Sequence, residues 1–187
     1  MIIKYNKINM SETNFDKFLP KNVDRPKFYL LLKPDLEYYN ELKETHEGDS
    51  GFDLITPEDI HFNENETKLV NLKVKTNMIM IESKNNNSDS YLLGKNMFYK
   101  SYNLRARSSI FKTNVRIANN QGLIDANYMG DIKVALDNIK PGEYILKKGT
   151  SIVQLALGCL SNFEVFKVED FPRTTSRGEN GFGSTGN

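Results

Sequence analysis

Short segments in which apolar and polar residues alternate recur along the chain. Val70, Leu72 and Val74 alternate with polar neighbours, and residues 131–136 repeat this pattern. A period of two residues is typical of a strand that buries one face. The same reasoning predicts further strands over residues 27–32, 77–82, 143–147, 151–157 and 163–168.

Turn signals separate these expected strands and indicate the fold class. Thr56-Pro57, Pro141-Gly142 and Lys148-Gly149 lie between apolar runs, where such pairs favour turns. Many short strands at this spacing are typical of a β sandwich, a jelly roll or a barrel. The pattern therefore predicts an all-β protein.

The 187 residues fit one domain with flanking segments. We expect a β-rich core over residues 26–170, interrupted by a polar, Asn-rich surface loop insertion over residues 83–96. Residues 1–25 are polar without sustained periodicity and are interpreted as an N-terminal extension. Residues 171–187 include four glycines among ten residues, too many for a packed element that stands unaided.

Composition narrows the classes of function. The formal net charge of +1 shows no excess of basic residues of the kind that binds duplex nucleic acid or an anionic membrane. No apolar run is long enough to span a membrane, and residues 1–7 lack the apolar stretch of a signal peptide. Cys159 is the one cysteine, and its apolar surroundings predict a small buried hydrophobe. We expect an intracellular protein, cytoplasmic or nuclear.

The glycine-rich segment over residues 177–186 permits two interpretations. It is either a flexible terminus or a flap that closes over an anion, because glycines let backbone N–H groups approach phosphate oxygens. Arg177, Ser184 and Thr185 add donors suited to phosphate. Phe182 has no core to join among glycines, but its ring can stack on a base.

Two further segments carry candidate chemistry. Arg107, Ser108 and Ser109 form either an exposed turn that opens a short helix capped by Ser108 or Ser109, or an anion site. Asp125 lies at an expected turn between two strands. It is either a turn former or a carboxylate held where it accepts a proton from water.

Two single residues are weaker candidates. Asp53 follows a glycine, a position at which a turn aspartate is the default explanation. Gln154 is a lone amide within an apolar strand, and a buried amide needs partners from the backbone or from a ligand.

Taken together and in order, these segments resemble the five motifs of the trimeric dUTP pyrophosphatases. The resemblance spans residues 50–187, and the third and fifth motifs are nearly complete. The matching segments are Ser50 to Leu54, Arg107 to Ser109, Gly122 to Gly130, Gly149 to Leu155 and Arg177 to Gly186.

The resemblance implies a distorted, jelly-roll-like β-barrel subunit in a homotrimer whose active sites are shared between chains. The C-terminal arm, residues 171–187, would close a neighbouring subunit's site. The reaction would convert dUTP and water to dUMP and pyrophosphate, which supplies a dTTP precursor and keeps uracil out of DNA. Mg²⁺ would be held mainly by the substrate phosphates and water, with no direct protein ligand.

The resemblance also implies a role for each matching residue. Asp125 would orient and deprotonate the attacking water, and Tyr128 would lie against the deoxyribose so that a 2′-hydroxyl has no space. The backbone from Asn119 to Leu123 would pair with the uracil edge, and Asp53 would have a supporting role. The other substrate-binding residues would be Gly122, Leu123 and Ile124 at the base, Arg107, Ser108, Ser109 and Gln154 at the phosphates, and Arg177, Phe182, Gly183, Ser184 and Thr185 on the arm.

Departures from the family pattern are few. Ala106 stands where the family usually has proline, which is expected to loosen the turn without removing a donor.

A dCTP deaminase is the nearest alternative, but it needs a glutamate at the position of Ala135. A catalytically silent interaction or regulatory protein is the other alternative. Such a chain is expected to have lost one of the residues Asp125, Tyr128, Arg107 and Phe182, all of which are present.

Overall fold

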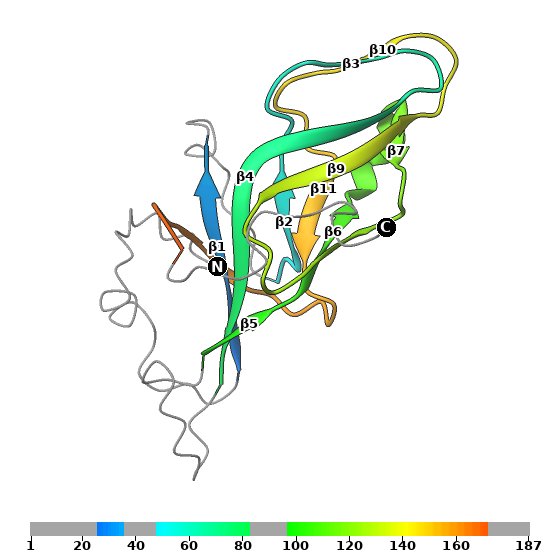
Figure 1. The fold of residues 1–187 in the computed structure, drawn as a ribbon. Coiled ribbons are helices and arrows are strands. Elements are labelled where there is room, and N and C mark those ends of the chain that lie inside the picture. Colours follow the sequence, from blue (N-terminus) through cyan, green and yellow to red (C-terminus); the bar gives the residue numbers. More distant parts are fainter. Residues whose placement is uncertain (1–25, 36–47, 83–96, 172–187) are drawn as a thin grey trace, which may run out of the picture.

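A computed structural model describes residues 26–35, 48–82 and 97–171 of the chain (Figure 1). Regular structure within these ranges consists of strands and one short 3-10 helix, η2 (Ser108–Lys112). The strands are β1 (Lys27–Pro34), β2 (Gly51–Leu54), β3 (Ile60–Phe62), β4 (Thr67–Ile81), β5 (Met97–Lys100), β6 (Tyr102–Ala106), β7 (Val115–Ile117), β8 (Gly122–Ile124), β9 (Asp131–Asn138), β10 (Tyr144–Leu146), β11 (Val153–Ala156) and β12 (Glu164–Lys167). The expected all-β class is confirmed.

The strands form two larger sheets and one sheet of only two strands. One sheet has the order β12-β1-β4-β9-β7, with β5 also paired to β4, and the other has the order β2-β11-β6-β8. Strands β3 and β10 form the third, two-stranded sheet. Buried apolar side chains from all three sheets belong to one core cluster, so the sheets pack around a common interior.

The predicted alternation is confirmed in strands β4 and β9. Val70, Leu72 and Val74 of β4 are buried while their neighbours are more exposed, and β9 alternates strictly along its length. Residues 77–82, expected as a further strand, instead continue β4 into one strand of 15 residues. The pairing of β4 with β9 shifts register between Asn71 and Lys75, where Lys73 adopts φ 54°. Such a bulge bends a strand without ending it.

The turn predictions are confirmed, whereas the prediction for the cysteine is wrong. Gly142 and Gly149 have φ of 85° and 77°, a backbone region that favours glycine. Cys159 is exposed rather than buried. The apolar run leaves the core after Leu157, where the N–H of Leu160 donates to the carbonyl of Leu157 and turns the chain outward. Hydrogen bonding with the side chain and backbone of Ser161 lowers the pKa of the Cys159 thiol.

Three expected segments lie largely or wholly outside the described residues: the extension over residues 1–25, the loop over residues 83–96 and the arm from residue 172 onward. The described strands lie between residues 27 and 167. Within the described ranges, no helix is long and apolar enough to cross a membrane.

Candidate active site

Four of the segments singled out in the sequence meet in the sheet β2-β11-β6-β8. Gln154 of β11 lies opposite Asp53 of β2 on one side and opposite Arg105 of β6 on the other. Directly opposed residues in antiparallel strands point to the same face of the sheet. The opposite face carries Phe52, Leu104 and Leu155, which are buried in the core. The polar residues therefore share the outer face.

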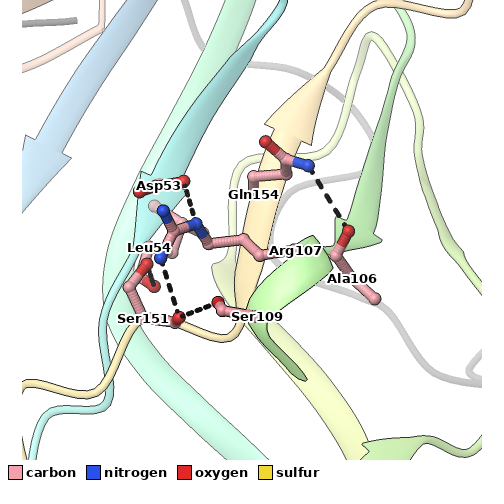
Figure 2. A network of polar contacts seen from close by, with 7 residues as sticks. All are labelled: Asp53, Leu54, Ala106, Arg107, Ser109, Ser151 and Gln154. Carbon is pink, nitrogen blue, oxygen red and sulfur yellow. Dashed lines mark hydrogen bonds and ion pairs between the residues drawn. The ribbon is translucent and has the colours of Figure 1, made fainter. Parts of the chain in front are cut away.

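Arg107 is the centre of the polar network on this face (Figure 2). It follows β6 directly, and its backbone N–H donates to the carbonyl of Ile152 over 2.8 Å. Its side-chain Nε lies 2.7 Å from Oδ1 of Asp53, and its Nη1 donates to the carbonyl of Ser151 over 3.0 Å. Two of the guanidinium nitrogens are thus fixed by the protein. A guanidinium has five N–H donors, so others are left for an anion.

Opposing influences act on Asp53. Partial burial raises the pKa of its carboxyl above the ordinary value, while Arg107 and a hydrogen bond from Ser151 act to lower it. The side chains of Asp53 and Arg107 are 41 % and 35 % exposed, so solvent screens their attraction. The ion pair therefore serves to orient Arg107 more than to stabilise the fold.

Ser109 and Gln154 complete the cluster. The hydroxyl of Ser109 donates to the same Ser151 carbonyl that accepts from Arg107, over 3.4 Å (Figure 2). The Nε2 of Gln154 donates to the carbonyl of Ala106 over 3.4 Å. Four of the predicted site residues, Asp53, Arg107, Ser109 and Gln154, are brought together in this way. We call these four the phosphate-side cluster.

The short helix after Arg107 differs from the expectation of a cap by Ser108 or Ser109. It is a 3-10 helix whose N-cap residue is Arg107, and no side-chain hydrogen bond caps it. Ser109 uses its hydroxyl on Ser151 instead, while Ser108 is exposed beside Arg107. Ala106, at the position of the family's proline, accepts from Gln154, and the backbone bond from Arg107 to Ile152 holds the turn.

Asp125 lies at the other end of strand β6. Ile124 pairs with Tyr102 at the start of β6, and the N–H of Ala126 donates to the hydroxyl of Ser101 over 3.3 Å. The N–H of Tyr128 donates to the carbonyl of Asp125 over 3.0 Å and closes the turn. The expected turn is therefore present, and it places Asp125 directly after the edge strand β8.

Tyr128 is anchored more firmly than the sequence indicated. Its side chain is 8 % exposed and belongs to the main core cluster. Its hydroxyl donates to the carbonyl of Asp131 over 2.7 Å. The ring is therefore held in one position, with only a small part of its surface available to a ligand.

The expected base-binding segment spans an exposed turn and strand β8. Asn119 lies in the turn, where its carbonyl accepts from the N–H of Gln121 over 2.7 Å and where Asn120 has φ 64°. Leu123 is 69 % exposed, while Ile124 is buried in the core. The outward-facing part of this segment is thus the turn and Leu123.

The two ends of the site are far apart within one chain. Strand β6 separates Ser101, beside Asp125, from Arg107, and the rise of about 3.3 Å per residue over six residues gives a separation of about 20 Å. A single chain therefore brings the phosphate-side cluster together but does not bring Asp125 and Tyr128 to it. Arg177, Phe182, Gly183, Ser184 and Thr185 lie outside the described residues.

Ser151 is the site residue that sequence reasoning missed. Its carbonyl accepts from both Arg107 and Ser109, and its hydroxyl donates to the carbonyl of Leu54 over 3.0 Å. Every residue has a backbone carbonyl, so the identity of the side chain does not show which carbonyl acts as an acceptor. The only available signal was its place two residues after Gly149, in a segment already singled out.

Comparison with known proteins identifies the family of the chain. A sequence profile described as dUTPase matches residues 102–186. A deoxyuridine 5'-triphosphate nucleotidohydrolase of Clostridium novyi (strain NT) is 31 % identical over 144 residues, which cover 76 % of this chain and 88 % of that protein. The chain belongs to the dUTPase family. A deoxyuridine 5'-triphosphate nucleotidohydrolase of Picosynechococcus sp. is 33 % identical over 145 residues, which cover 77 % of this chain and 89 % of that protein.

A solved structure supports the fold. The dUTPase of Staphylococcus bacteriophage 80alpha, solved with dUPNHPP, is similar with a TM-score of 0.50 at 22 % identity. The similarity covers 84 % of this chain and 98 % of the phage protein. The described strands of this dUTPase family member thus follow the fold of a solved dUTPase.

Proposed function

We propose that the chain hydrolyses dUTP to dUMP and pyrophosphate. Membership of the dUTPase family supports the substrate and the reaction. The observation that carries the proposal is the arrangement of Arg107, whose guanidinium is held by Asp53 and Ser151 beside Ser109 and Gln154. A fixed arginine with neighbouring hydroxyl and amide donors suits an oligophosphate.

The site is proposed to form between chains of a homotrimer. The reacting α-phosphorus must lie near the water held by Asp125, while the outer phosphates must reach Arg107. These residues lie about 20 Å apart within one chain, because they occupy opposite ends of β6. A triphosphate is too short to bridge that distance. A second copy that presents its Asp125 beside the phosphate-side cluster of the first would bring both groups within reach of one triphosphate.

Asp125 is proposed to act as the general base. Its carboxylate accepts a proton from water, the water oxygen forms a bond to the α-phosphorus, and the bond from that phosphorus to the bridging oxygen breaks. Pyrophosphate leaves with the electron pair of the broken bond. Proton removal by a positioned side chain accelerates such steps by about 10²- to 10⁴-fold.

The outer phosphates are proposed to be held by Arg107, Ser108, Ser109 and Gln154, with Arg177, Gly183, Ser184 and Thr185 added by the arm. Asp53 supports the site by orienting Arg107 through the 2.7 Å ion pair. Mg²⁺ is proposed to be bound mainly by substrate phosphates and water, a mode of binding that suits an ion that loses its water reluctantly. When bound, the ion offsets the charge of the triphosphate.

Selectivity is proposed to come from two surfaces. Tyr128, fixed by its bond to the carbonyl of Asp131, would lie against the deoxyribose and leave no room for a 2′-hydroxyl. Backbone groups from Asn119 to Leu123, with Gly122 and Ile124 in strand β8, would pair with the uracil edge, and Phe182 of the arm would stack on the base. A rigid site that leaves polar groups unpaired rejects analogues strongly.

A pyrophosphate-release assay tests the proposal directly. The full chain is incubated with dUTP, UTP, dTTP and dCTP in the presence of Mg²⁺, and ammonia is measured with dCTP. We expect rapid release from dUTP and release at least about 100-fold slower from the other three. Equal rates with UTP would contradict the role of Tyr128. Ammonia from dCTP would favour a deaminase, although Ala135 of β9 has no group that shuttles a proton.

A further inference from the structure

Gly51 opens strand β2 at the edge of the phosphate-side cluster. It pairs with Ala156 of the neighbouring strand β11, two residues from the pairing of Asp53 with Gln154. The side chain of Gln154 folds back across it. A Cβ at position 51 would lie 2.9 Å from Cδ and 3.4 Å from Cγ of Gln154, and it would overlap the Oε1 atom. The space a side chain would fill at position 51 is therefore already occupied by the amide of Gln154.

Backbone conformation does not account for this glycine. Gly48, Gly142 and Gly149 have φ between 77° and 92°, a region in which other residues are strained. Gly51 is not among the described glycines of positive φ. Alanine can therefore adopt the backbone of position 51, and the only conflict is with the end of one flexible side chain.

The position of the Gln154 amide is constrained on its other sides too. Its Nε2 donates to the carbonyl of Ala106 over 3.4 Å, which directs the amide toward the turn that leads into Arg107. Asp53, its cross-strand neighbour, is engaged by Arg107 in an ion pair of 2.7 Å. A Cβ at position 51 would drive the amide away from this place.

We propose that Gly51 is a positioning residue, whose absent side chain lets the Gln154 amide lie beside Arg107, where it contacts the substrate phosphates. This inference rests on the proposed function, because the phosphate contact of Gln154 belongs to it. Gly51 touches neither substrate nor reacting atoms and acts only through Gln154. The choice of glycine in this segment is then a requirement of the phosphate site rather than of the fold.

A double-mutant cycle in the full chain tests the proposal. Gly51→Ala, Gln154→Ala and the double variant are compared with wild type in kcat and KM for dUTP. We expect Gly51→Ala and Gln154→Ala each to lower kcat/KM about tenfold, as expected for a lost hydrogen bond to a charged group. The double variant should be no worse than Gln154→Ala within twofold, because both changes remove the same contact. Multiplied losses in the double variant would overturn the proposal.

Gly158→Ala is the matched control. A Cβ there meets only Nδ2 of Asn103 at 3.9 Å, and Gly158 follows the same strand, β11. Both changes restrict the unfolded chain equally. We expect wild-type kinetics from Gly158→Ala. If Gly51→Ala fails to fold, the double variant should fold because the obstructing side chain is gone. Failure of both would place the conflict in the backbone and overturn the proposal.

A readout independent of turnover separates this inference from the proposed function. The side-chain amide resonances of Gln154, assigned by their loss in Gln154→Ala, should move in Gly51→Ala and stay in place in Gly158→Ala. If wild type does not hydrolyse dUTP but the resonances move as expected, the proposed function fails while the steric positioning stands. Unmoved resonances in Gly51→Ala would refute the positioning whatever the activity.

Discussion

The two ends of strand β6 are built in contrasting ways. At one end, the phosphate-side cluster is held by contacts between neighbouring strands, with Arg107 fixed to Asp53 and to the Ser151 carbonyl. At the other end, Asp125 sits in a turn closed by a backbone hydrogen bond, beside the anchored ring of Tyr128. At the first end the carboxylate of Asp53 is paired with Arg107, whereas Asp125 at the other end lies about 20 Å from that arginine within one chain.

This difference indicates a division of labour. Within one chain, the length of β6 separates Asp125 from Arg107. Under the proposed mechanism, catalysis would then depend on the assembly of chains, whereas the proposed phosphate contacts are already arranged within each chain.

Asp125→Asn should have the largest effect. The amide keeps the size of the side chain but does not accept the proton, so kcat should fall by about 10³-fold. Binding of a non-hydrolysable dUTP analogue should stay within threefold of wild type, because the phosphate-side cluster is untouched. Pyrophosphate-release kinetics and calorimetry measure the two quantities. A kcat close to wild type would remove Asp125 from the mechanism.

Asp53→Asn tests the other end and should have an intermediate effect. Arg107 loses its ion pair at Nε, so its orientation relaxes and KM for dUTP should rise about fivefold with kcat less affected. Asp59→Asn is the matched control, since Asp59 forms a 2.8 Å ion pair with Lys147 and does not belong to the phosphate-side cluster. Equal KM values in the two variants would show that Asp53 does not orient the arginine.

Tyr128→Phe should have a smaller effect on selectivity. The hydroxyl donates to the carbonyl of Asp131, so the ring that is proposed to exclude the 2′-hydroxyl should stay in place without it. The ratio of kcat/KM for dUTP to that for UTP should change less than about twofold, while the free energy of unfolding falls by about 1 kcal/mol. A large loss of selectivity would show that the hydroxyl itself contacts the nucleotide.

The smallest expected effect concerns stability and pH, and it distinguishes the two aspartates. Bonds from the Lys147 side chain and the Lys148 N–H lower the pKa of Asp59. Its carboxylate therefore stabilises the fold above the unfolded pKa of about 3.9, and that contribution is lost as pH falls through the folded pKa. Asp59→Asn should lower Tm by about 1 °C at pH 7, and the difference should disappear as pH falls through the folded pKa.

Asp53 should show the opposite sign. Burial is the largest influence on its carboxyl and raises its pKa, so ionisation disfavours the folded state as pH rises through that value. Asp53→Asn should therefore keep or slightly raise Tm at pH 7 while it impairs KM. A fall in Tm equal to that of Asp59→Asn would contradict this assignment.

The patterns of β9 and of the first half of β4 were predictable from the sequence because these stretches bury one face. The alternation at Val70, Leu72 and Val74 reflects burial that depends on local periodicity alone. The bulge at Lys73 was not predictable, because it depends on the register with β9. The exposure of Cys159 was mispredicted because an apolar run does not show where a strand ends and the chain leaves the core.

The residues of the phosphate-side cluster could be singled out from the sequence, but their geometry could not. The order of the motifs pointed to Asp53, Arg107, Ser109 and Gln154 before any contact was known. The ion pair of Asp53 with Arg107 and the shared Ser151 carbonyl arise from the pairing of strands distant in sequence. The position of Gly51 beneath the Gln154 amide likewise required the register of β2 with β11.

Activity in mixed oligomers tests the shared site most directly. Asp125→Asn and Arg107→Ala chains, each nearly inactive alone, are co-expressed with different tags and purified through both tags. Every mixed trimer then contains one site that takes Asp125 from one chain and Arg107 from another, both intact. We expect about one third of wild-type activity from these trimers, because one of three sites is intact. Mixed trimers no more active than the separate variants would show that each site lies within a single chain.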